Sequence, residues 1–220
     1  MRFRAWLVIV ALLPLTFASC VFSVSPFSDE KTSELDHRLL GTWTKVKGDW
    51  GNDVITIGNK KGTKNTLEFI YIDLDEDDTA IVKRLTVYAR RGKIDLLSIE
   101  DEGKEGKKFY MLCKYEFSDP NTLHLILPDP QTVGEAVFRG ELKGEAKSIG
   151  EADVSPSEDK KGEIDSKKEI KSKDESKEPG SYDIVALTDS PKQIIEYLEK
   201  NASKCFKHKT VYKRIGEQVE

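Results

Sequence analysis

Residues 108–127 read KFYMLCKYEFSDPNTLHLIL, and this stretch decides the class of the fold. Before the turn at 119–121, every second side chain is large and apolar or carries sulfur. These side chains are Phe109, Met111, Cys113, Tyr115 and Phe117. Successive side chains of a strand point to opposite faces, so one face of this strand is wholly apolar. Leu123, Leu125 and Leu127 repeat the pattern after the turn, which predicts a hairpin lying on a hydrophobic core.

The same two-residue alternation recurs along the chain, and turn residues such as Gly58-Asn59 and Arg91-Gly92 separate the runs. Strands are predicted at 42–47, 54–57, 66–72, 80–89, 93–99, 108–117, 122–127, 182–187 and 206–215. Short helices are predicted at 131–138, ended by Gly140, and from Pro191, where Ser190 and Gln193 can form a capping box. The sequence therefore predicts a mainly β fold, an antiparallel up-and-down barrel or strongly curved sheet with two short helices.

One segment does not fit a packed fold. Residues 157–178 hold seven lysines and eight acids, with Ile164 and Ile170 as the only large apolar side chains. Such a composition cannot bury enough surface to offset chain entropy. We expect a disordered charged insertion at about 147–180. Because strands are predicted on both sides of it, the insertion interrupts a single domain that runs from 34 to 220.

The N-terminus predicts export. Arg2 and Arg4 precede an apolar run over 5–18, which is too short for a spanning helix and typical of a signal peptide at 1–19. Ala18-Ser19-Cys20 resembles the lipobox of bacterial lipoproteins, although that motif usually has Leu at the position of Phe17. The resemblance implies an acylated Cys20, a lipidated tether at 20–33, and a cell envelope location, anchored to the outer membrane facing the periplasm. Simple secretion is the alternative.

Net charge bears on the class of partner, and cysteine content bears on disulfide bonding. Cleavage of the leader changes the net charge from −4 to −6, so the mature chain has no basic footprint for nucleic acid. With Cys20 assigned to lipid, Cys113 and Cys205 remain. This pair is compatible with one disulfide in an oxidising compartment or with two separate buried thiols.

Gly41-Thr42-Trp43 opens the first predicted strand and resembles the G-x-W motif of lipocalins and related barrels. The resemblance can cover 34–215. It implies that Trp43 closes the base of the barrel and that Arg214, from the last strand, lies over its ring. The sequence departs from the family at Thr188-Asp189-Ser190, which lacks the aromatic residue of the second motif. The chain also resembles small bacterial lipoproteins that begin their domain with Leu-x-Gly-Thr-Trp.

No motif for catalysis is present. The chain lacks a nucleophile elbow, a zinc-protease motif, a P-loop and a dinucleotide fingerprint, so we expect no enzyme activity, cofactor or metal site. Two functions remain. In the first, a membrane-tethered barrel binds a small apolar ligand. Its cavity would be lined by Phe69, Tyr71, Tyr88 and Tyr115. In the second, a barrel with a filled core acts through its surface as a structural or protein-interaction lipoprotein. The oligomeric state is left open.

Overall fold

The computed structural model describes residues 20–48, 51–74, 80–102, 106–147 and 182–216. The predicted signal peptide at 1–19 and nearly all of the predicted insertion at 147–180 lie outside these ranges. The barrel strands are β2 (Gly41–Lys47), β3 (Val54–Asn59), β4 (Thr66–Leu74), β5 (Ala80–Arg90), β6 (Leu96–Glu102), β7 (Lys108–Asp119), β8 (Thr122–Pro128) and β11 (Phe206–Arg214). The other elements are β1 (Cys20–Ser23), the 3-10 helix η1 (His37–Leu39), α1 (Pro130–Phe138), β9 (Gly144–Lys147), β10 (Ile184–Leu187), α2 (Pro191–Lys200) and α3 (Ala202–Cys205).

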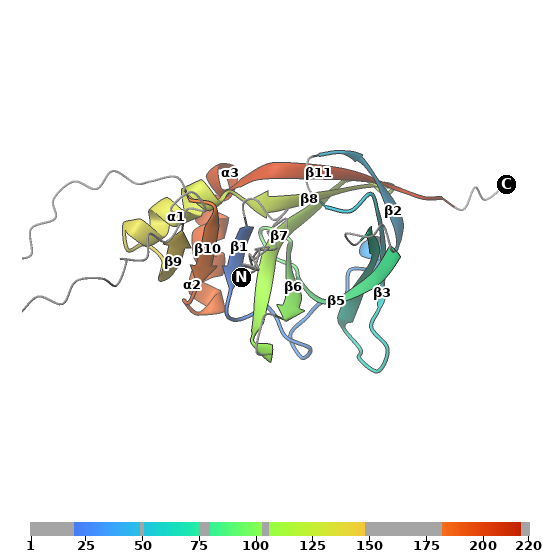
Figure 1. Cartoon of the computed structure of the whole chain (residues 1–220), viewed down its shortest axis with the longest axis horizontal. Coiled ribbons are helices and arrows are strands. Elements are labelled where there is room, and N and C mark those ends of the chain that lie inside the picture. Colours follow the sequence, from blue (N-terminus) through green and yellow to red (C-terminus); the bar gives the residue numbers. More distant parts are fainter. Residues whose placement is uncertain (1–19, 49–50, 75–79, 103–105, 148–181, 217–220) are drawn as a thin grey trace, which may run out of the picture.

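Eight antiparallel strands close into a barrel, which confirms the predicted fold class (Figure 1). Each of β2 to β7 pairs with the next strand along the chain. β11 completes the circle by pairing with β8 and with β2. The alternation in the quoted stretch has the predicted result, since Cys113 and Tyr115 of β7 and Leu123 of β8 belong to the barrel core. The architecture is compatible with a lipocalin-like fold.

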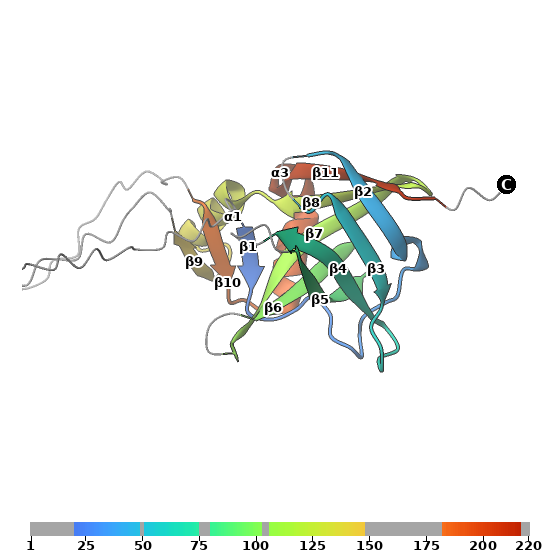
Figure 2. The same cartoon turned by 45° about the vertical axis from the view of Figure 1, so that its right-hand side comes forward.

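A second layer lies beside the barrel (Figures 1 and 2). β1 pairs with the first half of β7, where Phe22 faces Met111, whereas the second half of β7 pairs with β8. β10 and then β9 extend this small sheet outward. A second hydrophobic core fills the space between the small sheet, the helices and the outer face of β6 and β7. It includes Val21, Leu96, Leu112, Val133, Val185, Ile194, Leu198 and Cys205.

The helix α2 begins at Pro191 as predicted, and α1 begins at Pro130, one residue before the predicted start. Ser190 caps α2 by accepting a hydrogen bond from the backbone N–H of Gln193, and Pro191 occupies the first turn. Asp129 caps α1 in the same manner, and Gly140 follows that helix with a φ of +70°. A positive φ is strained for residues with a Cβ, so glycine suits this termination.

Candidate functional site

The interior of the barrel is occupied by its own side chains. Ten inward residues from all eight barrel strands are each no more than 2% exposed. They are Trp43, Ile57, Leu67, Val87, Leu97, Cys113, Tyr115, Leu123, Leu125 and Tyr212. All ten belong to one continuous core cluster. An eight-stranded barrel is just wide enough for side chains to fill, and this barrel follows that rule.

The structure divides the four residues predicted to line a ligand cavity. Phe69 and Tyr115 point into the barrel, where they are 5% and 1% exposed, and Tyr71 packs partly buried against the same core. The prediction for Tyr88 is wrong. Val87 and Ala89 are the inward residues of β5, so Tyr88 between them lies on the outer face. There its hydroxyl donates to Glu100 at 3.1 Å.

Tyr115 serves the base of the barrel. Its hydroxyl donates to Oδ2 of Asp36 at 3.2 Å, and the same carboxylate pairs with Arg38 at 2.6 Å. Burial opposes ionisation of Asp36, but the hydrogen bonds from Arg38 outweigh it and lower the pKa of this carboxyl. The Arg38 guanidinium also lies 4.7 Å from the centre of the Phe117 ring. These contacts fix the segment before β2 across the end of the barrel.

Trp43 and Arg214 complete the base. The indole N–H of Trp43 donates to the carbonyl of Leu39, and the Cζ of Arg214 lies 4.2 Å from the ring centre. Arg214 also donates to the carbonyls of Leu40 and Arg38, at 2.5 and 2.7 Å. Gly41 has a φ of +135°, and a Cβ there would lie 2.5 Å from the Arg214 guanidinium. The glycine of the Gly41-x-Trp43 motif thus leaves room for the arginine that covers the tryptophan.

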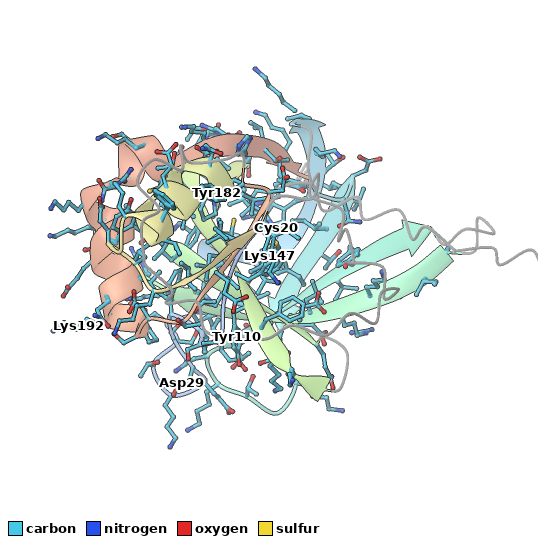
Figure 3. The ribbon with its side chains drawn as sticks, turned by 60° about the vertical axis from the view of Figure 1, so that its left-hand side comes forward. Cys20, Asp29, Tyr110, Lys147, Tyr182 and Lys192 are labelled. Carbon is cyan, nitrogen blue, oxygen red and sulfur yellow. The ribbon has the colours of Figure 1, made fainter. Side chains whose placement is uncertain are left out.

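Residues 20–33 are part of the fold, so the prediction of a spacer tether is wrong. Cys20 begins β1 next to Ile184 of β10, and Lys147 of β9 follows across the sheet (Figure 3). Further along, Phe27 is 7% exposed and its backbone N–H donates to Ser98. The four residues of β1 are too few to show a strand pattern in the sequence, and Ser25-Pro26 is typical of a loop.

The cysteines are all free and buried. Cys113 belongs to the barrel core and Cys205 to the second core, so the disulfide that the sequence left open as one alternative does not form. The alternative of two separate buried thiols is the arrangement found. Burial raises the pKa of Cys113 to about 12, and that of Cys20 and of Cys205 to about 11. Thiols with such pKa values are poor nucleophiles at neutral pH.

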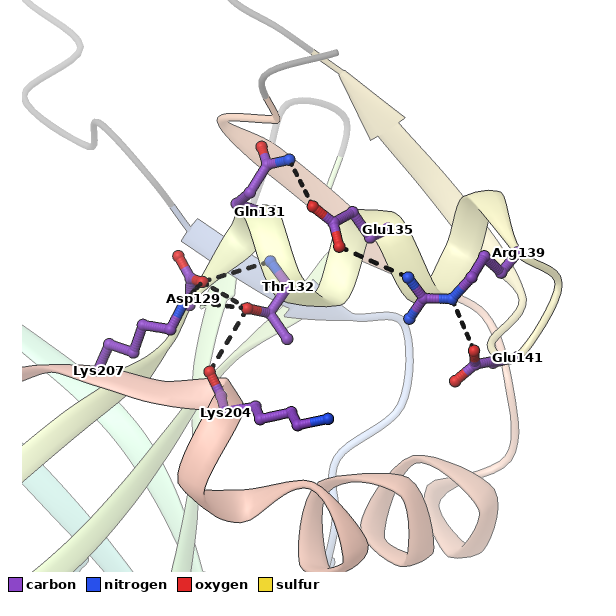
Figure 4. A network of polar contacts seen from close by, with 8 residues as sticks. All are labelled: Asp129, Gln131, Thr132, Glu135, Arg139, Glu141, Lys204 and Lys207. Carbon is purple, nitrogen blue, oxygen red and sulfur yellow. Dashed lines mark hydrogen bonds and ion pairs between the residues drawn. The ribbon is translucent and has the colours of Figure 1, made fainter. Parts of the chain in front are cut away.

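A polar network joins α1 to the start of β11 (Figure 4). Asp129 accepts hydrogen bonds from Thr132 at 2.5 Å and from Lys207 at 2.6 Å. Burial opposes ionisation of Asp129, but these two hydrogen bonds outweigh it and lower its pKa. Because Asp129 also caps α1, the network orients this helix on the barrel.

Sequence reasoning missed a cluster on the outer face of β7 and β8. His124 lies between Ser118 Oγ and Glu116 Oε1, with both distances 3.3 Å. Glu116 and Ser118 are two residues apart on one face, and His124 is the cross-strand partner of Glu116. The predicted hairpin already implied this pairing of Glu116 with His124, and it was the signal in the sequence that could have revealed the cluster. Glu116 also pairs with Lys114 and Lys209, which ties the carboxylate into surface ion pairs.

The outer face of β3, β4 and β5 exposes three aliphatic side chains, which we name the outer apolar row. Val54, Ile72 and Val82 are 45%, 63% and 57% exposed. Ile72 and Val82 are cross-strand partners, and Val54 precedes Ile55, which faces Tyr71. All three line a shallow hollow of about 730 Å³.

Two further findings concern the described residues alone. No three His, Cys, Asp or Glu side chains among them are grouped closely enough to hold a metal ion. Within the same ranges, no helix has both the length and the apolar character needed to cross a bilayer. Comparisons of the chain with protein-family models, with curated proteins and with solved structures found no match.

Proposed function

We propose that this chain is an exported protein of the cell envelope whose barrel binds another macromolecule at its outer surface, with no catalytic role and no small-molecule cargo. The filled interior carries this proposal. Leu67, Val87 and Leu97 come from three different strands and are all 0% exposed. A pocket for a small ligand generally encloses several hundred Å³, and these side chains occupy the space that such a pocket needs.

The outer apolar row supports binding at the surface. Single exposed aliphatic side chains are normal on soluble proteins, but contiguous ones mark interaction sites. Ile72 and Val82 face each other across β4 and β5 and are each more than half exposed. Val54 lies on the adjoining strand and lines the same hollow. The surface is shallow, which suits a macromolecule better than a small molecule.

The location is proposed from the leader and from Ala18-Ser19-Cys20. Attachment to a membrane through an acylated Cys20 is part of the proposal. It would require Cys20 to give up the contacts that it makes in the fold. Cys20 is 4% exposed, and its backbone N–H donates to the Asp183 carbonyl at 3.0 Å. Acylation would have to draw Cys20 out of β1. The small sheet of β1, β10 and β9 would then face the membrane.

The purified protein tests the proposal against the apolar-ligand function. Titration with a fluorescent fatty-acid analogue should show no saturable binding, and native mass spectrometry should show no bound small molecule. The Phe69→Ala variant is the matched control, because removal of this interior ring opens a void that a benzene-sized probe can enter. Saturable binding of the fatty-acid analogue to the unaltered protein would overturn the proposal.

A further inference from the structure

The hairpin of β7 and β8 places a serine, a histidine and a carboxylate in a row on the outer face of the barrel. The ring of His124 lies between the other two groups. Its Nε2 atom is 3.3 Å from Ser118 Oγ, and its Nδ1 atom is 3.3 Å from Glu116 Oε1. This order of hydroxyl, imidazole and carboxylate is the one that activates a serine nucleophile in enzymes. The cluster therefore has the connectivity needed to remove a proton from Ser118.

An irregularity in the strand pairing brings the serine to the histidine. Phe117 faces Leu123 and Asp119 faces Thr122, so β7 has one residue more than β8 between these two pairs. That extra residue is Ser118, which forms a β-bulge. A bulge redirects a side chain away from the regular strand pattern. Here the Ser118 side chain is exposed, and its hydroxyl still lies within hydrogen-bond distance of the Nε2 atom.

The charge of Glu116 sets the direction of both hydrogen bonds. Hydrogen bonding from Lys114 lowers the pKa of Glu116 to about 2, so at neutral pH this side chain is a carboxylate and only accepts hydrogen bonds. A neutral imidazole in this place carries its proton on Nδ1 and presents the lone pair of Nε2 to Ser118. The His124 side chain is only 11% exposed, which restricts rotation of the ring. Ser118 thus donates its hydroxyl to the atom that can take the proton.

Going beyond the proposed function, we infer that Ser118 is a modification site that accepts an acyl group from an activated ester, with His124 as the general base. Ser118 Oγ bonds to the carbonyl carbon of the ester, and the bond from that carbon to the leaving oxygen breaks. The proton passes from Oγ to Nε2 of His124 and then to the leaving oxygen, so the products are acylated Ser118 and an alcohol. Glu116 acts through the histidine and is a positioning residue.

The open position of Ser118 limits this chemistry to a single transfer. Ser118 is exposed on the outer face of the barrel, so an ester reaches it freely but gains little binding energy there. Catalysis with turnover depends on binding energy that is realised in the transition state. We therefore expect one acyl group per chain and no turnover. This outcome agrees with the absence of a catalytic role in the proposed function.

A fluorophosphonate probe tests whether Ser118 is an activated nucleophile. The folded protein should gain one adduct, which peptide mass spectrometry should place on Ser118. Protein unfolded in urea should gain none, because the hairpin holds the base beside the serine. A folded protein that gains no adduct would overturn the inference, as would an adduct on another residue or equal labelling of the unfolded chain. These three measurements use the unaltered sequence and so do not depend on the folding of a variant.

Variants test the two roles in the reaction. Ser118→Ala should gain no adduct, and His124→Ala should react about a hundredfold more slowly, as expected for the loss of a general base. Ser203→Ala is the matched control, because Ser203 is also exposed but lies on α3, and it should react at the unaltered rate. Circular dichroism checks that each variant folds. A folded His124→Ala variant that reacts at the unaltered rate would overturn the role of the histidine.

The positioning role of Glu116 has its own comparison. Glu116→Gln keeps an oxygen that accepts from Nδ1, so it should retain more of the labelling rate than Glu116→Ala. Lys209→Ala removes an ion pair of the same carboxylate and should not slow the labelling. An equal loss of rate in all three variants would overturn the positioning role.

p-Nitrophenyl acetate tests the single transfer. Release of nitrophenolate above the background rate should stop after one equivalent per chain, and Ser118→Ala should show no such burst. Continued release that requires Ser118 would overturn the single transfer, together with the absence of a catalytic role in the proposed function. Saturable binding of the fatty-acid analogue, in contrast, would refute the proposed function and leave the reactivity of Ser118 unaffected.

Discussion

Replacing Arg214 is the most direct test of how the barrel closes. Truncation to alanine removes two hydrogen bonds to carbonyls and the contact with the Trp43 ring. The bond to Leu40 is partly buried and charge-assisted, which corresponds to about 1.5 kcal/mol. The bond to Arg38 is exposed and contributes about 0.5 kcal/mol, and the cation–π contact contributes about 1 kcal/mol. We expect Arg214→Ala to lower the free energy of unfolding by about 3 kcal/mol.

Urea unfolding followed by circular dichroism measures this change, and the melting temperature should fall by roughly 9 °C for a chain of this size. Arg214→Lys should lose about half as much, because an ammonium keeps the charge but lacks the flat fork that reaches both carbonyls. Lys213→Ala changes the exposed neighbouring residue and should stay within about 0.5 kcal/mol of the unaltered protein. An Arg214→Ala variant as stable as Lys213→Ala would refute the role assigned to the base.

Three other predictions use different measurements. Gly41→Ala should destabilise the protein by about 2 kcal/mol in urea, because its φ is +135° and Arg214 occupies the space, whereas Gly58→Ala, with open space around it, should be neutral; equal effects would contradict the account. Hydrogen bonding from Lys114 lowers the pKa of Glu116 to about 2, so its stabilising effect is complete above about pH 4.5 and is lost as the pH falls towards 2. Glu116→Gln should therefore lower the free energy of unfolding by about 1 kcal/mol at neutral pH, a value reduced for the 39% exposure of the side chain. Below pH 2 the substitution should have no effect on stability. A difference that persists in acid would be evidence against the ion pairs. Thiol titration of the folded protein should find no reactive cysteine, and in denaturant it should find two thiols if Cys20 is acylated and three if it is not; two fewer thiols in either case, none or one, would restore the Cys113–Cys205 disulfide.

Sequence reasoning succeeded where one strong local pattern determined the outcome. The apolar alternation from Phe109 to Phe117 is long and uninterrupted, so hydrophobic burial leaves only one choice of face. The capping residues of α2 likewise act within one turn of the helix. Such patterns specify elements because every contact that they depend on lies close in the sequence.

It failed where the outcome depends on distant contacts. Tyr88 lies in β5, a strand with apolar side chains on both faces, so alternation alone does not fix which face is inside. The β1 strand forms because it pairs with the edges of β7 and β10. Its four residues carry no pattern that predicts those partners. The separation of Cys113 from Cys205 depends on which of two cores each enters. The sequence alone does not show that the fold has two hydrophobic cores, because their number depends on the strand topology.

The clearest motif and the best functional surface therefore lie in different places. Gly41, Trp43 and Arg214 are explained by the closure of the barrel, because each fits a contact at its base. A residue whose presence folding already explains gives no information about a ligand. Ile72 and Val82 are the opposite case, because folding alone favours polar side chains at outward positions of a half-exposed strand. Folding of the chain does not explain their exposure. This is the reason to seek the function on the outer face of β4 and β5 and not inside the barrel.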